Sequence, residues 1–438
     1  MRPRQSRPRL LQAMIDAFSL PDLRRRILLT VGILVAFRFI AHVPLPGVNA
    51  AALTQLFNTN AMLGMLDLFS GGAMRNFSIA AMGVYPYITA SIIMQLMVPI
   101  FPQLQALTQE GEAGRHKINL YTHWLTVPSA ALAAYGQLIL LQRENVVATA
   151  SPLSTVAIIM SMIAGTMFLV WLGELITEYG IGNGVSIIIF GGIVAGLPQS
   201  IGQGYLARGQ FFGLAIYIII ALATAILIVI FTEAHRRIPV QYARSVFRGG
   251  RMYKQSGATH IPLRVNTAGM IPLIFAMSLV IFPSIIASYF AAAPSAEPNW
   301  ANQLMTIFSP STPLPLGLVY WLLYFLLVVA FSFFYTMVVF QQQDLPGVLQ
   351  KQGGFIPGVR PGKQTSAYLN AVIYHITWAG ALFLAFVAII PFFAREVTGV
   401  QALQLSSIGM LIVIGVVLDT MKQLEAQLVM RRYEGFIK

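Results

Sequence analysis

Very few residues of this sequence could carry catalytic or metal chemistry. The 438 residues include no cysteine, which excludes disulfides, thiolate metal sites and cysteine nucleophiles. The six histidines are scattered, and none belongs to a His-Glu-x-x-His pair. The sequence also lacks a Gly-x-Ser-x-Gly motif and a phosphate-binding loop. We therefore expect no enzymatic activity, no metal ion and no cofactor.

Ionisable residues are also rare inside the apolar segments of the chain. Arg38, Glu174, Glu178 and Asp419 lie near segment ends, and His375 is the main inner candidate. Coupled transporters use ionisable groups near the middle of the membrane. Their scarcity argues against proton- or sodium-coupled transport. A secondary transporter remains the alternative function, and an intramembrane enzyme is a third.

The elements that would position these residues are long apolar segments. The chain is 57% hydrophobic and only 10% charged, whereas soluble domains carry about 25% charged residues. Most of its surface must therefore face lipid, where helices satisfy their own backbone hydrogen bonds. Ten spanning helices are predicted near residues 27–43, 77–98, 118–141, 153–175, 184–202, 211–232, 267–290, 315–340, 368–394 and 402–419.

A shorter apolar segment, residues 61–72, contains Asp67 and the pair Gly71-Gly72. Its length is too small to cross ~30 Å of hydrocarbon as a helix. It is predicted to be either a surface helix or a re-entrant piece shielded by protein.

The positive charges fall on one side of this arrangement. With ten spans, 23 of the 28 lysines and arginines lie on the side of the N-terminus. Lys and Arg collect in cytoplasmic loops of membrane proteins, so both termini are predicted to be cytoplasmic. The net charge of +13 is thereby explained without a nucleic-acid partner.

Two loops on the predicted cytoplasmic side stand out. Residues 233–264 form a long basic loop, and residues 341–365 are rich in glycine and proline, which favour fixed turns. Ordinary loops between spans are shorter. We interpret both loops as docking surfaces for an anionic or acidic partner, rather than as solvated connections.

Several motifs along the chain are more specific than an apolar composition requires. The longest are Leu68–Gly72 followed by Ser78–Leu96, and then Trp171–Ile189. Shorter motifs are Phe37-Arg38 with Pro44-x-Pro46-Gly47, Thr259–Asn266 and Gly353–Gly362. All of them resemble the motifs of the SecY family of protein-conducting channels. They occur in order from the first predicted span to the ninth, so the resemblance covers nearly the whole chain.

The resemblance implies an all-α polytopic membrane protein, with ten transmembrane helices in two five-helix halves that form an inverted repeat around a central pore. The implied parts are a cytoplasmic segment 1–26, an N-terminal half 27–202, a C-terminal half 203–420 and a cytoplasmic tail 421–438. The implied function is to translocate unfolded polypeptides across the bacterial inner membrane and to release apolar segments laterally into lipid.

The resemblance also implies two elements that close the pore. The first is a ring of aliphatic side chains, formed by Val84, Ile88, Val185, Ile189, Ile274 and Ile412. Such a ring excludes water and ions by dewetting and offers a passing peptide no fixed partner. The second is a plug within residues 61–72, formed by Met65, Leu66, Asp67, Leu68, Phe69, Ser70, Gly71 and Gly72, with the two glycines as a hinge.

A side opening and a docking surface are implied as well. The opening, or lateral gate, would lie between the second and seventh spans, lined by Thr89, Gln137, Asn266 and Phe282. Docking would involve Arg244, Arg248, Arg251, Lys254 and Arg360. The implied partners are the small membrane subunits SecE and SecG, the motor ATPase SecA, the ribosome, unfolded preproteins and membrane lipid.

Overall fold

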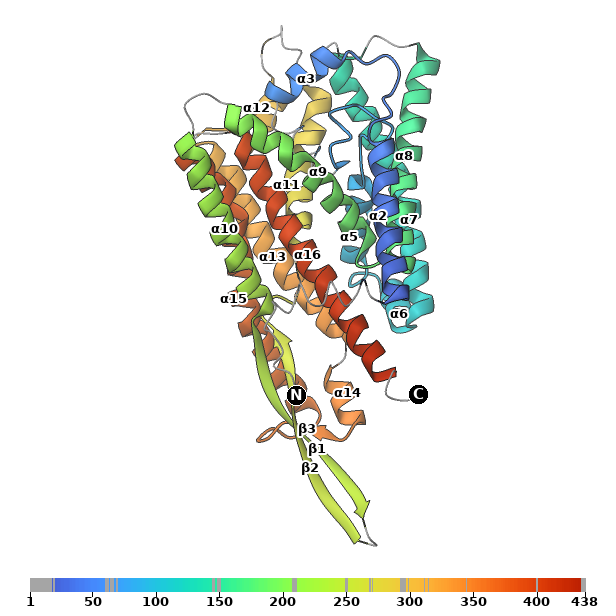
Figure 1. Cartoon of the computed structure of the whole chain (residues 1–438), viewed down its shortest axis with the longest axis vertical. Helices are drawn as coiled ribbons and strands as arrows, with labels where there is room; N and C mark the ends of the chain where they lie inside the picture. Colours follow the sequence, from blue (N-terminus) through green and yellow to red (C-terminus); the bar gives the residue numbers. More distant parts are fainter. Residues whose placement is uncertain are drawn as a thin grey trace. The chain divides into compact units, whose positions relative to one another are not determined.

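The computed structural model describes residues 18, 20–59, 63, 67, 70–143, 146–147, 151–206, 211–248, 251–267, 269, 271–291, 297, 299–310, 312–313, 315–343, 345–398 and 401–434. Figure 1 labels its elements. The helices are α2 (Pro21–Ile40), α3 (Ala50–Thr59), α5 (Tyr85–Met97), α6 (Pro102–Gln109), α7 (Glu112–Arg143), α8 (Pro152–Tyr179), α9 (Gly184–Leu206), α10 (Phe211–Glu233), α11 (Ile271–Phe290), α12 (Trp300–Ile307), α13 (Gly317–Gln343), α14 (Leu345–Lys351), α15 (Lys363–Thr398) and α16 (Gln401–Glu434). The strands are β1 (His235–Arg248), β2 (Arg251–Arg264) and β3 (Gly354–Phe355).

Each predicted span falls on a helix, and local sequence explains several helix starts. Pro152 occupies the first turn of α8, where a missing N–H costs nothing, and the Ser151 hydroxyl accepts a hydrogen bond from the Ser154 N–H. The Asn183 side chain accepts from the Ser186 N–H at the start of α9. The predicted helical fold class is therefore confirmed.

The second predicted span begins later than expected. Helix α5 starts at Tyr85, whereas the sequence predicted a helix from residue 77. Phe77 and Gly83 have φ angles of 41° and 57°, which a right-handed helix cannot accommodate. The backbone of this stretch instead pairs with the chain after α2, where the Leu45 N–H donates to the Phe77 carbonyl and the Ile79 N–H to the Val43 carbonyl. The prediction for residues 77–84 was wrong because those backbone contacts replace helical ones.

The number of spans stays a prediction. By length and composition, four helices of the described chain could each cross a membrane: Glu112–Gln142, Pro152–Tyr179, Gly317–Lys351 and Lys363–Ile390. The bent pair Tyr85–Met97 and Pro102–Thr108 would make a fifth. Shorter apolar helices occupy Gly184–Gly196, Ile218–Glu233 and Ile271–Ala287.

The chain divides into two compact units. The first contains Met1–Ala221, Met277–Trp321 and Pro391–Lys438. Within it α7 packs against α5, α6 and α8, while α9 packs against α8 and α16. Leu23, Ile181 and Leu424 form a small buried cluster where α2 and α16 meet the turn before α9. This unit holds most of the predicted pore residues.

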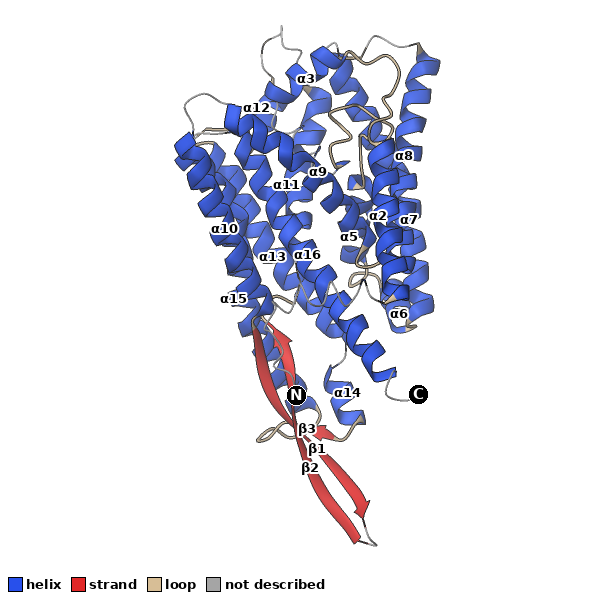
Figure 2. Ribbon diagram, in the orientation of Figure 1, coloured by secondary structure: helices blue, strands red, loops and turns tan. Residues whose placement is uncertain are grey.

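The second unit contains Leu222–Ala276 and Leu322–Ile390. Its strands form a sheet of order β2-β1-β3 (Figure 2, red). Strands β1 and β2 are antiparallel partners along their whole length, from His235↔Arg264 to Arg248↔Arg251. The short strand β3 adds to β1 through Gln241↔Phe355 and Tyr242↔Gly354. A buried apolar cluster supports the sheet, formed by Ile238, Val240, Phe340, Leu349, Ile356, Leu369, Val372 and Ile373.

The hairpin β1–β2 was not predicted, because residues 233–264 were interpreted only as a basic loop. Two sequence signals point to it. Gly249-Gly250 separates two runs of equal length, and such a pair is typical of a two-residue hairpin turn. Ile238 and Val240 also alternate with exposed Arg237 and Pro239, the period of a strand with one buried face.

Candidate functional site

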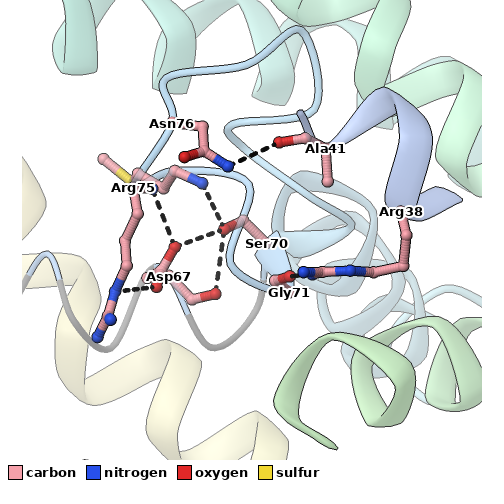
Figure 3. A network of polar contacts seen from close by, with 8 residues as sticks. Arg38, Ala41, Asp67, Ser70, Gly71, Arg75 and Asn76 are labelled. Carbon is pink, nitrogen blue, oxygen red and sulfur yellow. Dashed lines mark hydrogen bonds and ion pairs between the residues drawn. The ribbon is translucent and has the colours of Figure 1, made fainter. Parts of the chain in front are cut away.

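The described residues of the predicted plug lie in a buried polar network (Figure 3). Asp67 Oδ2 lies 2.9 Å from Arg75 Nε, and Asp67 Oδ1 accepts a hydrogen bond of 3.1 Å from the Arg75 N–H. The Ser70 hydroxyl donates to the Asp67 carbonyl at 3.1 Å and accepts from the Met74 N–H at 3.0 Å. These contacts join Asp67 to the compact loop of residues 70–75. Met65, Leu66, Leu68 and Phe69 lie outside the described residues.

Gly71 fixes the position of this loop against α2 and α9. Arg38 Nη1 donates a hydrogen bond of 2.8 Å to the Gly71 carbonyl. A Cβ on Gly71 would lie 2.6 Å from a ring carbon of Phe37 and 2.8 Å from the Gly192 Cα, so a side chain has no room there. Gly71 and Gly72 also have φ angles of 66° and 84°, which favour glycine. The pair thus forms a tight turn, and its role as a hinge stays a prediction.

The loop is joined to the chain after α2 by further contacts. The Asn76 side chain donates to the Ala41 carbonyl at 3.2 Å. Together with the Leu45–Phe77 and Ile79–Val43 backbone bonds, this contact continues the loop into the turns before α5. The loop therefore rests on α2 and α9 without being part of either helix.

The Asp67 carboxyl makes the packed position of this loop less stable when it is ionised. Burial raises the pKa of the Asp67 carboxyl above its ordinary value, and the nearby Arg75 guanidinium only partly opposes this effect. A carboxyl with a raised pKa favours the buried state most when protonated. Its contribution is therefore present at acidic pH and is lost as the pH rises through the raised pKa. Ionising the carboxyl in this position therefore costs free energy.

The predicted ring residues are mostly buried. Val84, Ile88, Ile189 and Ile412 expose 5% of their surface or less, and Val185 is half-buried. They lie on α5 or directly before it, on α9 and on α16, and α9 packs against α16 in the first unit. Ile274 is also buried but belongs to the second unit. Their role as a ring stays a prediction.

The predicted lateral-gate residues lie in different surroundings. The Thr89 hydroxyl donates to the Tyr85 carbonyl of its own helix at 3.2 Å, and Phe282 on α11 is 38% exposed. Gln137 Oε1 on α7 is buried without a hydrogen-bond partner among the described residues. Asn266 is buried in the second unit, where its side chain donates to the Gly269 carbonyl at 3.1 Å.

Sequence reasoning missed the contact that joins α5 and α11. The Tyr85 hydroxyl donates to the Ser278 carbonyl at 3.4 Å, and both residues are buried in the first unit. It links the two helices that were predicted to form the lateral gate. We call the contact between α5 and residues 277–290 of α11 the seam. Nothing in the local sequence pairs residues so distant in the chain.

The structure brings the two predicted docking loops together. Residues of both loops pair in one sheet through β1 and β3, over the apolar cluster of the second unit. Arg244 pairs with Gln255, and Arg248 pairs with Arg251 at the far end of the hairpin. Lys254 pairs with Ser245.

Arg360 is exposed in the turn that follows β3. The carbonyl of Arg360 accepts a hydrogen bond of 3.0 Å from the Thr365 hydroxyl. Gly358 and Gly362, on either side of Arg360, have φ angles of 82° and 98°. Glycine geometry therefore fixes this turn independently of the Arg360 side chain.

Comparisons with known sequences show the family of the chain. A family model described as SecY matches residues 78–421. The chain is 41% identical to Protein translocase subunit SecY of Halalkalibacterium halodurans, over 98% of this chain and 100% of that protein. It is also 41% identical to the subunit of the same name from Thermotoga maritima, over 98% of each.

Solved structures share the fold. A structure described as that of a protein conducting channel superposes with a TM-score of 0.63 at 17% identity, covering 97% of this chain and 98% of that chain. Sec61 in the canine ribosome–channel complex of the endoplasmic reticulum gives the same TM-score, identity and coverage. At that identity the likeness establishes the fold alone.

Proposed function

This chain belongs to the SecY family, and we propose that it forms the channel through which unfolded polypeptides cross the membrane and from which apolar segments enter lipid. It is a multi-pass membrane protein. The observation that carries the proposal is the loop of residues 70–77, which is packed against spanning helices but belongs to none of them. Such a loop can leave its position without unfolding a helix, as a plug must.

In this proposal residues 61–72 close the idle channel. The Arg38–Gly71 hydrogen bond and the Gly71–Gly192 contact support a defined seated position. Burial of the Asp67 carboxyl opposes its ionisation and so lowers the stability of that position, which helps an entering polypeptide to displace the plug. A plug with a fully favourable core would resist displacement.

We expect Gly192→Ala to unseat the plug. A Cβ on Gly192 would lie 2.0 Å from the Gly71 Cα, and overpacking of this kind costs about 1–3 kcal/mol. The idle channel should then conduct ions roughly 5- to 100-fold more often in planar bilayers, since each 1.4 kcal/mol changes a population tenfold. Gly196→Ala, one turn further along α9, is the matched control because nothing lies within 4 Å of its Cβ position. Equal conductance of the two variants would contradict the seating of the plug on Gly192.

The aliphatic residues of the first unit are proposed to form the constriction. Val84 and Ile88 are four residues apart, as are Val185 and Ile189, so each pair lies along one side of its segment. An apolar constriction excludes water from the idle channel and lets polypeptides of any sequence pass. Ile412 on α16, and Ile274 from the second unit, are assigned to the same ring through the family resemblance.

Replacing Ile88 and Ile189 with asparagine tests the channel function. Amide side chains would hydrate the constriction, so the idle double variant should leak ions in planar bilayers where the parent is tight. The variant with valine at both positions keeps the site apolar and should stay tight. If the asparagine variant is as tight as the parent, these residues do not form the seal.

Lateral release requires that one contact between helices can open. We propose that this is the seam between α5 and α11, lined by Thr89 and Phe282. Gln137 on α7 and Asn266 before α11 are assigned to the same gate through the family resemblance. The Tyr85–Ser278 hydrogen bond across the seam supports this placement. Neutral contacts suit an interface that opens, because a buried ion pair is costly to break.

As a translocase subunit, the chain works within an assembly. We propose that SecE and SecG accompany it in the bacterial inner membrane, and that SecA or the ribosome docks on the surface formed by residues 233–264 and 341–365. The basic residues Arg244, Arg248, Arg251 and Lys254 lie along the hairpin, and Arg360 lies beside it. Because Lys and Arg favour cytoplasmic loops, this surface and both termini are placed in the cytoplasm.

A further inference from the structure

A second polar contact holds α5 on the side away from the seam. Tyr87 lies two residues after Tyr85, so the two side chains leave α5 about 200° apart. The Tyr87 hydroxyl donates to Asn119 Oδ1 on α7 at 3.4 Å. Asn119 Nδ2 in turn donates to Glu174 Oε1 on α8 at 2.8 Å. A chain of hydrogen bonds therefore connects α5 to α8 through α7.

Glu174 is the end point of this chain and receives a further contact. His123 Nε2 on α7 lies 2.9 Å from the same Oε1 atom. The His123 ring also lies against the Tyr87 ring, with centroids 5.8 Å apart. Glu174 is only partly exposed, as are Tyr87, Asn119 and His123. One carboxylate oxygen thus contacts two residues of α7, and both of these contact Tyr87 of α5.

The two tyrosines contact different helices, so opening of the gate affects their hydrogen bonds differently. Tyr85 bonds across the seam to α11, whereas Tyr87 bonds toward α7 and α8. If the seam parts, the Tyr85 contact must break. Helix α5 can stay in place relative to α7 and α8 only if the Tyr87 contact holds. In that contact Tyr87 donates to Asn119, and Asn119 donates in turn to Glu174.

We propose that Glu174 is a positioning residue of the lateral gate, which holds α5 to α7 and α8 through Asn119 and Tyr87 so that the seam opens between α5 and α11. This inference rests on the proposed channel function. Glu174, which lies outside the proposed pore, would thereby determine which contact of α5 separates. Glu174 itself touches no passing polypeptide in this role.

The test measures two distances in the complete reconstituted complex. Because the chain has no native cysteine, spin labels attach to this chain only where cysteine is introduced. Labels at the exposed positions Ile93 on α5 and Tyr121 on α7 report the held contact. Labels at Ile93 and the exposed Leu279 on α11 report the seam. Both pairs are measured in the idle channel and with a stalled reporter polypeptide inside it.

In the parent we expect the α5–α7 distance to stay constant while the α5–α11 distance grows on engagement. In Glu174→Leu the α5–α7 distance should broaden at rest and shift by at least about 2 Å on engagement, the scale of helix displacements in switching proteins. Tyr87→Phe removes one hydroxyl with little risk to folding and should act in the same direction. Glu174→Gln keeps an acceptor for Asn119 and should restore the parent distances.

Glu178→Leu is the matched control, since Glu178 is exposed one turn further along α8 and its carboxylate interacts with Tyr179 of the same helix. It should behave as the parent. Unchanged α5–α7 distances in both Glu174→Leu and Tyr87→Phe would overturn the proposal. A parent complex that admits no reporter would contradict the channel function instead, and the resting α5–α7 distances would still decide the role of Glu174.

Discussion

A covalent bridge across the seam should abolish both secretion and membrane insertion. The bridge joins Thr89→Cys on α5 to Phe282→Cys on α11, by oxidation or by a short bifunctional reagent. An apolar segment of ~20 residues gains a few tenths of a kcal/mol for each Leu or Ile that enters lipid. It can reach lipid from inside the channel only if a contact between helices opens. The Tyr85–Ser278 bond shows that these two helices touch in the structure.

The bridge is assayed by transport of a secreted reporter and a membrane-inserted reporter. Both activities should fall to background on bridging and return on reduction, and each single cysteine variant should transport at the parent rate. Bridging with undiminished activity would place the opening elsewhere. The same conclusion would follow if no neighbouring pair on α5 and α11 could be bridged.

Reversing the charge of Arg360 should stop translocation while leaving the protein folded and inserted. The turn is fixed by Gly358, Gly362 and the Thr365 hydrogen bond to the Arg360 carbonyl, so the exposed side chain can change without disturbing it. A guanidinium meets carboxylates, phosphates or carbonyls with defined geometry, and a carboxylate would repel the first two. We expect Arg360→Glu to lower translocation by at least about tenfold, as loss of a charged contact worth 2–5 kcal/mol would.

The measurement is the rate at which a preprotein becomes protected inside vesicles. Arg115→Glu makes the same charge reversal at an exposed site outside both docking loops and should leave that rate within about twofold, since exposed charges contribute little. Normal translocation by Arg360→Glu would refute the docking assignment.

The sequence predicted the helices well because lipid imposes a simple rule. An apolar run such as residues 153–175 must be helical to satisfy its backbone, and α8 indeed covers it. The rule failed at residues 77–84, where Phe77 and Gly83 adopt positive φ angles and the backbone pairs with residues 43–45. Hydropathy carries no information about such pairing. The hairpin was missed for a different reason. Residues 233–264 were interpreted from their positive charge alone, and the alternation around Ile238 and Val240 was not used.

The site could be predicted only in part. Asp67 and Gly71 were singled out by an unusual charge and a glycine pair, and both proved central to the buried loop. Their partners could not be predicted, because Gly192 lies more than a hundred residues away and Arg75 follows the segment that was considered. The hydrogen bonds from Tyr85 and Tyr87 likewise depend on how helices pack, which a single sequence does not specify.

Photo-crosslinking of a stalled polypeptide tests the central claim most directly. A photoreactive residue is placed at Ile88 on α5, at Ile189 on α9 or, as a control, at the exposed Ile219 on α10. The complex then engages a reporter chain that is held halfway through translocation. If this chain forms the channel, the reporter should crosslink to positions 88 and 189 and not to position 219. A reporter that translocates but crosslinks only to position 219, with none to position 88 or 189, would show that polypeptides do not pass through the proposed constriction.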